Sequence, residues 1–137
     1  MFMKIGEEND VSYSDDNELV TQFVDWTDEA VVELRQIMDA FTDPTVRSAD
    51  SIARLYDLAH NIKGMGTSFN FDLMTAVGTT LCAYLKSLQA TDPVSKRVLE
   101  AHIRTFEVVL QNRIVGDGGA QGTALKLRLQ TIVQEAT

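Results

Sequence analysis

Residues 59–64, with the sequence AHNIKG, contain the side chains best suited to chemistry in this chain. Residues three and four apart on an α-helix are neighbours, so a helix here places Lys63 and Gly64 on the same side as His60. That side would carry a nucleophilic imidazole, a fixed positive charge and one position without a side chain. Glycine inside a helix costs about 1 kcal/mol relative to alanine. Close approach of another molecule's backbone or phosphoryl group would account for such a glycine.

Covalent transfer of a phosphoryl group is the chemistry that this triplet favours. Histidine is a competent nucleophile at neutral pH without a partner base. Lys63 carries a compact positive charge, and a pair of unit charges ~4 Å apart at an effective dielectric of ~20 is worth about 4 kcal/mol, an upper guide for an exposed site. A helix histidine is often only a surface residue. The lysine one turn later and the small residues Gly64, Gly66 and Thr67 favour the reactive interpretation.

The elements that would position these residues follow from hydrophobic spacing. Residues 1–16 are polar and acidic, which indicates a flexible N-terminal tail, and residues 17–137 form a single helical domain. A helix is predicted from 17 to about 41, although a break near Trp26 stays open because Thr27 could cap a second helix. Proline at position 44 ends this element. Its apolar stripe consists of Leu19, Phe23, Trp26, Ala30, Leu34, Ile37 and Phe41.

The next helix carries His60 and is predicted from about 48 to 69, with Ser48 or Asp50 as its N-cap. Its apolar stripe consists of Ile52, Leu55, Ala59, Ile62, Gly66 and Phe69. A separate face at 4-3-4 spacing consists of Tyr56, His60, Lys63 and Thr67, so His60 should face solvent. Asn70 then reverses the chain, because asparagine tolerates positive φ.

A third helix from 72 to about 89 should pack antiparallel to the helix of His60. Residues at equal distances along the chain on either side of the Asn70 turn should lie beside each other. This would bring Thr80, Ala83 and Tyr84 beside His60 if their side chains face outward. A fourth helix is predicted to begin at Pro93 and to run to about 114. Residues 116–122 would form a flexible glycine-rich loop, followed by a last short helix over 123–134. The predicted fold is all-α: an antiparallel up-down four-helix bundle with an additional short C-terminal helix.

Composition excludes several classes of function. The net charge of −8 and the pI near 4.6 argue against binding of nucleic acid or of anionic membranes, which carry the same sign of charge. Cys82 is the single cysteine, so no intrachain disulfide forms and a reducing cytoplasm is expected. No apolar run approaches the ~20 residues of a membrane span.

The motif resembles that of the histidine phosphotransfer (HPt) domains of bacterial two-component phosphorelays, which include the phospho-accepting domain of chemotaxis kinases. Their signature, Ala-His-x-x-Lys-Gly, is matched by Ala59, His60, Lys63 and Gly64. The family's apolar-Gly-apolar turn corresponds to residues 69–71, with asparagine in place of glycine. The acidic amphipathic helix that opens such domains is similar to the one predicted over residues 17–41.

The resemblance implies a phosphoryl carrier that is not an enzyme by itself. His60 would accept a phosphoryl group from the aspartate of a response-regulator receiver domain, or from a sensor or hybrid histidine kinase, and pass it to another receiver. Lys63 would stabilise the phosphoryl charge, and the partner-docking surface would include Tyr56, Gly64, Thr67 and Ser68. No cofactor is expected on this chain, because Mg²⁺ belongs to the receiver.

Two alternatives stay open beside this interpretation. A non-phosphorylated interaction module would bind a receiver or kinase through the same face as an inhibitor or scaffold. A metal-binding four-helix bundle is disfavoured, because no helix carries the Glu-x-x-His pattern and one cysteine with two distant histidines makes no metal site. His102, without the lysine and glycine, is expected to be a surface or core-edge residue, and Cys82 is expected to pack in the core.

Overall fold

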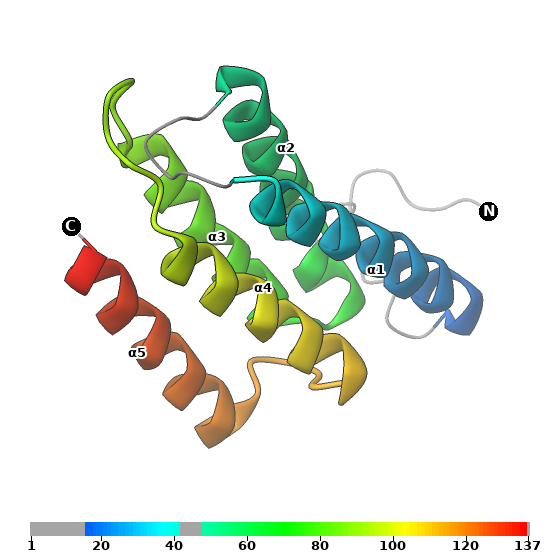
Figure 1. Ribbon diagram of the computed structural model, residues 1–137. Coiled ribbons are helices and arrows are strands. Elements are labelled where there is room, and N and C mark those ends of the chain that lie inside the picture. Colours follow the sequence, from blue (N-terminus) through cyan, green and yellow to red (C-terminus); the bar gives the residue numbers. More distant parts are fainter. Residues whose placement is uncertain (1–15, 42–47, 137) are drawn as a thin grey trace, which may run out of the picture.

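The computed structural model describes residues 16–41 and 48–136 of the chain, and Figure 1 shows their arrangement. These residues are all-helical and contain no strand, which confirms the predicted fold class. The helices are α1 (Asn17–Asp39), α2 (Ala49–Gly66), a short 3-10 helix η2 (Thr67–Phe69), α3 (Asp72–Ser87), α4 (Lys96–Gln111) and α5 (Gly119–Ala136). None of the described helices combines the length and the apolar character that crossing a membrane requires.

Helix α1 is continuous, so the break considered near Trp26 is absent. Asp16 caps its start, with Oδ1 accepting the Leu19 N–H at 3.0 Å. Thr27 does not cap a second helix, because its side chain is fully buried in the middle of α1. The predicted tail up to residue 15 and the proline turn at residue 44 lie outside the described residues.

Ser48, and not Asp50, caps α2, because the Ser48 hydroxyl accepts the Asp50 N–H at 3.1 Å and the Ser51 N–H at 3.4 Å.

The turn that carries the chain from α2 into α3 forms as predicted. Asn70 adopts the left-handed conformation at φ 65° and ψ 29°. The Gly116 N–H donates to the Asn70 carbonyl at 2.6 Å, and the Leu73 N–H donates to the Gly116 carbonyl at 3.1 Å. The segment predicted to be a flexible glycine loop therefore braces this turn.

The predicted start of α4 at Pro93 is wrong. Helix α4 begins at Lys96, because the Ser95 hydroxyl accepts the Val98 N–H at 3.2 Å and provides the N-cap. The Ser95 N–H in turn donates to the Tyr84 hydroxyl oxygen at 2.8 Å, which ties the cap to α3. Asp92 closes a local turn instead, by accepting the Gln89 N–H at 2.9 Å.

The last helix is longer than predicted, since α5 has 18 residues and begins at Gly119 instead of Thr123. Gly118 and Gly119 have φ values of 78° and 58°, and the Gly119 N–H donates to Asp117 Oδ1 at 2.9 Å. A Cβ at Gly122 would collide with the Asp117 carbonyl oxygen. Half of the glycine-rich segment is therefore the tightly packed first turn of α5.

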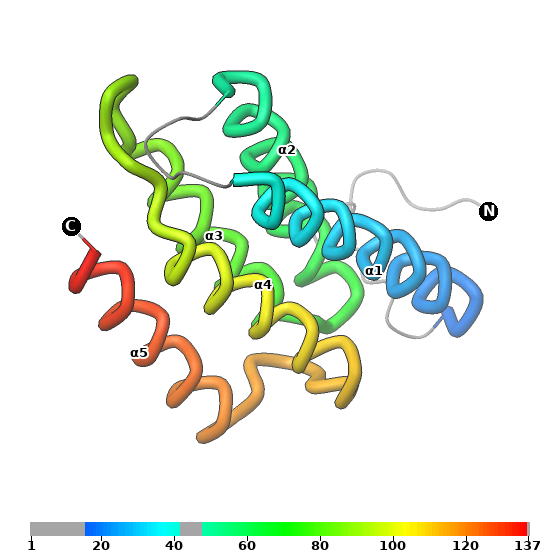
Figure 2. The backbone as a smooth tube through the Cα atoms, in the orientation of Figure 1, coloured from blue at the N-terminus to red at the C-terminus, as the bar shows by residue number. Residues whose placement is uncertain are grey.

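One hydrophobic core joins the helices. Helix α2 packs along α3, α1 packs along α4, and α5 contacts α3 and α4. Figure 2 shows that α2, α3, α4 and α5 each run opposite to the helix that precedes them in the sequence. Arg35 of α1 also binds two carboxylates of α4, Glu107 at 2.9 and 3.0 Å and Glu100 at 3.0 and 3.3 Å. Of the predicted stripes, Leu19, Trp26, Ile37, Ile52 and Phe69 are only partly buried.

Candidate functional site

His60 lies on the exposed face of α2, opposite the face that enters the core. Its neighbours Ala59 and Ile62 are both fully buried, as the predicted stripe required. The imidazole stacks on the ring of Tyr56, one turn earlier, with ring centroids 5.8 Å apart and an interplanar angle of 13°. This contact restrains the ring without removing it from solvent.

A surface hollow of about 450 Å³ opens beside the imidazole. His60, Asn61, Gly64 and Met65 of α2 line it together with Trp26 of α1. Trp26 is therefore a wall of the hollow as well as a partly buried residue packed against the core. None of the described residues that line this hollow is a carboxylate, so these residues form neither a general acid–base pair nor a set of metal ligands.

A second hollow of about 280 Å³ adjoins the first, because Trp26 and Met65 line both. Its other walls are Leu19, Gln22, Phe23 and Phe69, so its lining is mainly apolar. Phe23 and Phe69 stack with their ring centroids 4.5 Å apart, which makes this wall a rigid aromatic surface. The two hollows lie along α1 and the end of α2 and share two wall residues, and together we call them the α1–α2 depression.

Of the three neighbours predicted for His60 from α3, Tyr84 is wrong. Tyr84 is buried and binds the Ser95 N–H, so it does not face His60. Helix α3 instead covers the other flank of α2, where Gly78 lies against Ala59 and Lys63. A Cβ built at Gly78 would be 2.9 Å from Lys63 Cβ and 3.1 Å from the Ala59 carbonyl oxygen. The correct neighbour of His60 comes from α1.

Lys63 is half-buried where α2 meets α3. Burial raises the pKa of the Cys82 thiol on α3, and the positive charges of Lys63 and Lys86 oppose that rise. Within the described parts of the chain, the Lys63 ammonium forms no ion pair with a carboxylate. Its charge is therefore available for an anionic group bound one turn away.

The end of α2 is held by Thr75 of α3. The Thr75 hydroxyl donates to the Lys63 carbonyl oxygen at 2.9 Å and accepts the Thr67 N–H at 3.0 Å. Gly66 permits this contact, because a Cβ there would lie 2.5 Å from Thr75 Oγ1 and 2.8 Å from the Phe71 carbonyl oxygen. The backbone that carries Lys63 is thus fixed by α3, while His60 and Gly64 are exposed.

Gly64 differs from Gly66 in having open space around it. A Cβ built at Gly64 meets no atom within 4 Å. The fold itself therefore does not require glycine at this position, although it lies on the surface between His60 and the end of α2. Clearance for a second molecule remains the explanation for this residue.

The residues predicted to dock a partner are divided by the structure. Gly64 shares the hollow with His60, and Tyr56 contacts the imidazole ring. Thr67 is exposed and Ser68 is half-buried on η2, and neither lines the hollow. Sequence reasoning missed Asn61, Met65 and Trp26 as wall residues. Their signal was weak, since only the position of Trp26 at the edge of the α1 stripe hinted at an exposed aromatic side chain.

The other reactive side chains are buried. His102 is fully buried, deeper than the expected core edge, with Nδ1 2.7 Å from the Val98 carbonyl oxygen. Burial lowers the pKa of His102, and its Nε2 has no hydrogen-bond partner in the described structure. Cys82 is also buried. Over residues 16–41 and 48–136, no group of three or more histidine, cysteine or acidic side chains is arranged to hold a metal ion.

Comparisons of the chain with protein-family models, with curated proteins and with solved structures gave no match. We therefore infer the function from the chemistry of the α1–α2 depression and of the His60 motif.

Proposed function

We propose that this protein is a histidine-containing phosphotransfer protein whose α1–α4 form an antiparallel four-helix bundle with α5 added at one edge. His60 accepts a phosphoryl group and passes it to or from a receiver-domain aspartate in a two-component phosphorelay. The observation that carries this proposal is the exposed imidazole of His60 beside an open hollow, with Lys63 and Gly64 on the next turn of the same helix.

The transfer step exchanges one bond to phosphorus for another. A lone pair of an unprotonated imidazole nitrogen of His60 attacks the phosphorus of an aspartyl phosphate, a P–N bond forms, and the P–O bond to the aspartate breaks. The aspartate leaves as a carboxylate, and the other ring nitrogen of His60 keeps its proton. The reverse step delivers the phosphoryl group to a second receiver. Exposure of the ring supports this role, because phosphorus must approach in line with the departing oxygen.

The chain's own residues position the groups and do not catalyse proton transfer. Tyr56 restrains the imidazole by stacking, and Thr75 fixes the backbone at Lys63. The Lys63 ammonium would balance the new negative charge on the phosphoryl oxygens. Among the described residues no carboxylate lines the His60 hollow, so we expect the magnesium ion and the acidic residues of the reaction to come from the partner.

The α1–α2 depression is suited to docking a receiver domain. Its aromatic and aliphatic walls adjoin His60, so a partner that buries them would bring its aspartyl phosphate to the imidazole. Apolar area buried on binding contributes roughly 25 cal/mol per Å², and aromatic side chains at the centre of an interface carry much of the affinity. We expect Trp26 and Phe69 to be the main contacts.

The test is phosphorylation by an active kinase and receiver from the same organism, followed by localisation of the phosphate. We expect one acid-labile, base-stable phosphate in the native protein and none in His60→Gln with an unchanged circular-dichroism spectrum. His102 stays in place in this variant and serves as an internal control. Persistent labelling of His60→Gln would remove His60 from the proposal.

A non-phosphorylated interaction module is the second candidate, because the apolar part of the α1–α2 depression could dock a receiver without any transfer. This candidate predicts that native protein and His60→Gln bind a receiver equally well while neither is ever phosphorylated. Measuring affinity and phosphate content on the same samples separates the two functions.

A further inference from the structure

A third hollow lies between α4 and α5, with α3 and α4 between it and α2, the helix of His60 (Figure 1). Its volume is about 300 Å³, at the lower end of the range for small-molecule sites. Aliphatic side chains form part of its lining: Ala101, Val108, Leu125, Leu129 and Ile132. We call it the α4–α5 hollow.

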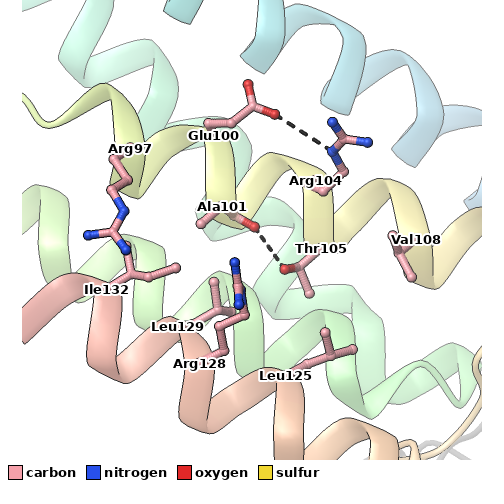
Figure 3. Close-up of a pocket in the computed structure, with 10 residues that line it drawn as sticks. All are labelled: Arg97, Glu100, Ala101, Arg104, Thr105, Val108, Leu125, Arg128, Leu129 and Ile132. Carbon is pink, nitrogen blue, oxygen red and sulfur yellow. Dashed lines mark hydrogen bonds and ion pairs between the residues drawn. The ribbon is translucent and has the colours of Figure 1, made fainter.

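Three arginines line the same hollow, namely Arg97, Arg104 and Arg128, and its other polar lining residues are Glu100 and Thr105. Their clustering is unexpected for a chain with 12 basic and 20 acidic residues. In Figure 3, Arg97 extends from α4 toward α5, and Arg128 extends from α5 toward α4. Two guanidinium groups therefore approach the gap from opposite helices, above aliphatic side chains.

These arginines are only weakly held by the protein's own carboxylates. Arg97 pairs with Glu135 at 2.6 Å, but the two side chains are 64% and 53% exposed. Arg104 lies 3.7 Å from Glu100, and Glu100 is already held by two hydrogen bonds from Arg35. Exposed pairs of this kind contribute little to stability, because water and salt screen them. A bound anion would therefore replace only weak ion pairs between these arginines and the protein's own glutamates.

Arg128 is the least satisfied of the three. It forms no hydrogen bond or ion pair with any side chain in the described part of the chain. An extended arginine above an aliphatic lining can offer a carboxylate or phosphate two parallel N–H donors while its stem covers apolar surface.

We propose that the α4–α5 hollow binds a small amphipathic organic anion, one carboxylate or phosphate group on an aliphatic or aromatic body. The anionic group lies between Arg128 and Arg97, and the body contacts Leu125, Leu129 and Ile132. This site is independent of the proposed phosphotransfer function, because none of its residues lines the His60 hollow.

The experiment is a titration of the full ¹⁵N-labelled chain with octanoate, followed by amide chemical shifts. Saturable shifts should be confined to α4 and α5, around Ala101, Thr105 and Leu129. Arg128→Gln should weaken binding at least tenfold, and Arg97→Gln should weaken it to a lesser extent. Lys126→Gln removes the same charge from α5 but lies about 200° around the helix from Arg128, so it should leave the affinity unchanged.

Octanamide and lipid vesicles provide the discriminating controls. Octanamide should bind at least tenfold more weakly than octanoate, since it lacks the charge. Vesicles containing phosphatidylglycerol should not bind, because the chain carries a net charge of −8. Four results would each overturn the proposal. They are equal binding of octanamide and octanoate, equal losses of octanoate affinity in Arg128→Gln and Lys126→Gln, binding to vesicles alone, and no saturable shift at millimolar octanoate.

Discussion

Substituting Gly64 by alanine should make the protein more stable and a poorer phosphoryl carrier at once. Alanine is favoured over glycine in a helix by about 0.5–1 kcal/mol, and the added Cβ meets no atom within 4 Å in this fold. The free energy of unfolding should therefore rise by up to about 1 kcal/mol, which corresponds to a melting temperature higher by roughly 3–4 °C for a chain of this size.

Gly66→Ala is the matched control, because Gly66 lies two residues further along α2 but is buried. A Cβ at Gly66 would lie 2.5 Å from Thr75 Oγ1 and 2.9 Å from the Thr75 nitrogen, so the contact between α2 and α3 must open. Overpacking of this kind costs about 1–3 kcal/mol. Urea unfolding followed by circular dichroism should therefore move in opposite directions for the two variants.

Phosphotransfer to Gly64→Ala should be slower by about tenfold or more, because the methyl group occupies the clearance beside His60; tenfold corresponds to about 1.4 kcal/mol at the transition state. The assay is the rate at which a phosphorylated receiver loses its label. Loss of stability in Gly64→Ala would refute the described packing, and transfer at the native rate would refute the role of Gly64 in partner approach.

Three further predictions concern single side chains. Lys63→Ala should shorten the lifetime of the phosphorylated form, or slow its formation, by about two- to fivefold, since a charge interaction at a partly exposed site is worth about 0.2–1 kcal/mol. Lys86→Ala is the control. Native lifetimes and rates in both variants would remove the role of Lys63. Trp26→Ala should weaken receiver binding by more than tenfold, whereas Val32→Ala on the exposed side of α1 should not. In the native protein the single tryptophan also reports binding by its fluorescence. An unchanged dissociation constant in Trp26→Ala would exclude this wall from the interface. Finally, burial lowers the pKa of His102, so below pH 6.5 the unfolded chain binds a proton that the folded chain does not. The free energy of unfolding should therefore fall as the pH drops below about 6.5, the ordinary pKa of histidine, and stay level above it. Urea midpoints between pH 5 and 8 should lose this slope in His102→Leu, and an identical slope in both proteins would contradict the buried neutral imidazole.

The helices and the direction of His60 were predictable, because both follow from local rules. The 3.6-residue period placed His60 opposite Ala59 and Ile62, and the tolerance of asparagine for positive φ predicted the Asn70 turn. Ser48 was one of the two candidate caps for α2. The α4 start was missed, since a proline after Thr91-Asp92 is a strong local signal, whereas the Ser95 cap depends on a hydrogen bond from its N–H to the distant Tyr84 hydroxyl.

The surroundings of His60 could not be predicted from the helical period. Helix α3 follows α2 directly in sequence, which suggested that it would supply the neighbours. Gly78 and Gly66 instead let α3 press against the Lys63 flank, and Trp26 of α1 reaches the hollow. Which helix covers which flank depends on long-range packing of small residues, and a single stripe of apolar positions does not encode it.

The most direct measurement of the central claim is the site and bond type of the phosphate after transfer from a phosphorylated receiver. Tandem mass spectrometry at neutral pH, together with ³¹P nuclear magnetic resonance, identifies a P–N bond and the residue that carries it. We expect one phosphoramidate on a ring nitrogen of His60. A phosphate on another residue, or a native protein that binds the receiver and stays unmodified, would contradict it.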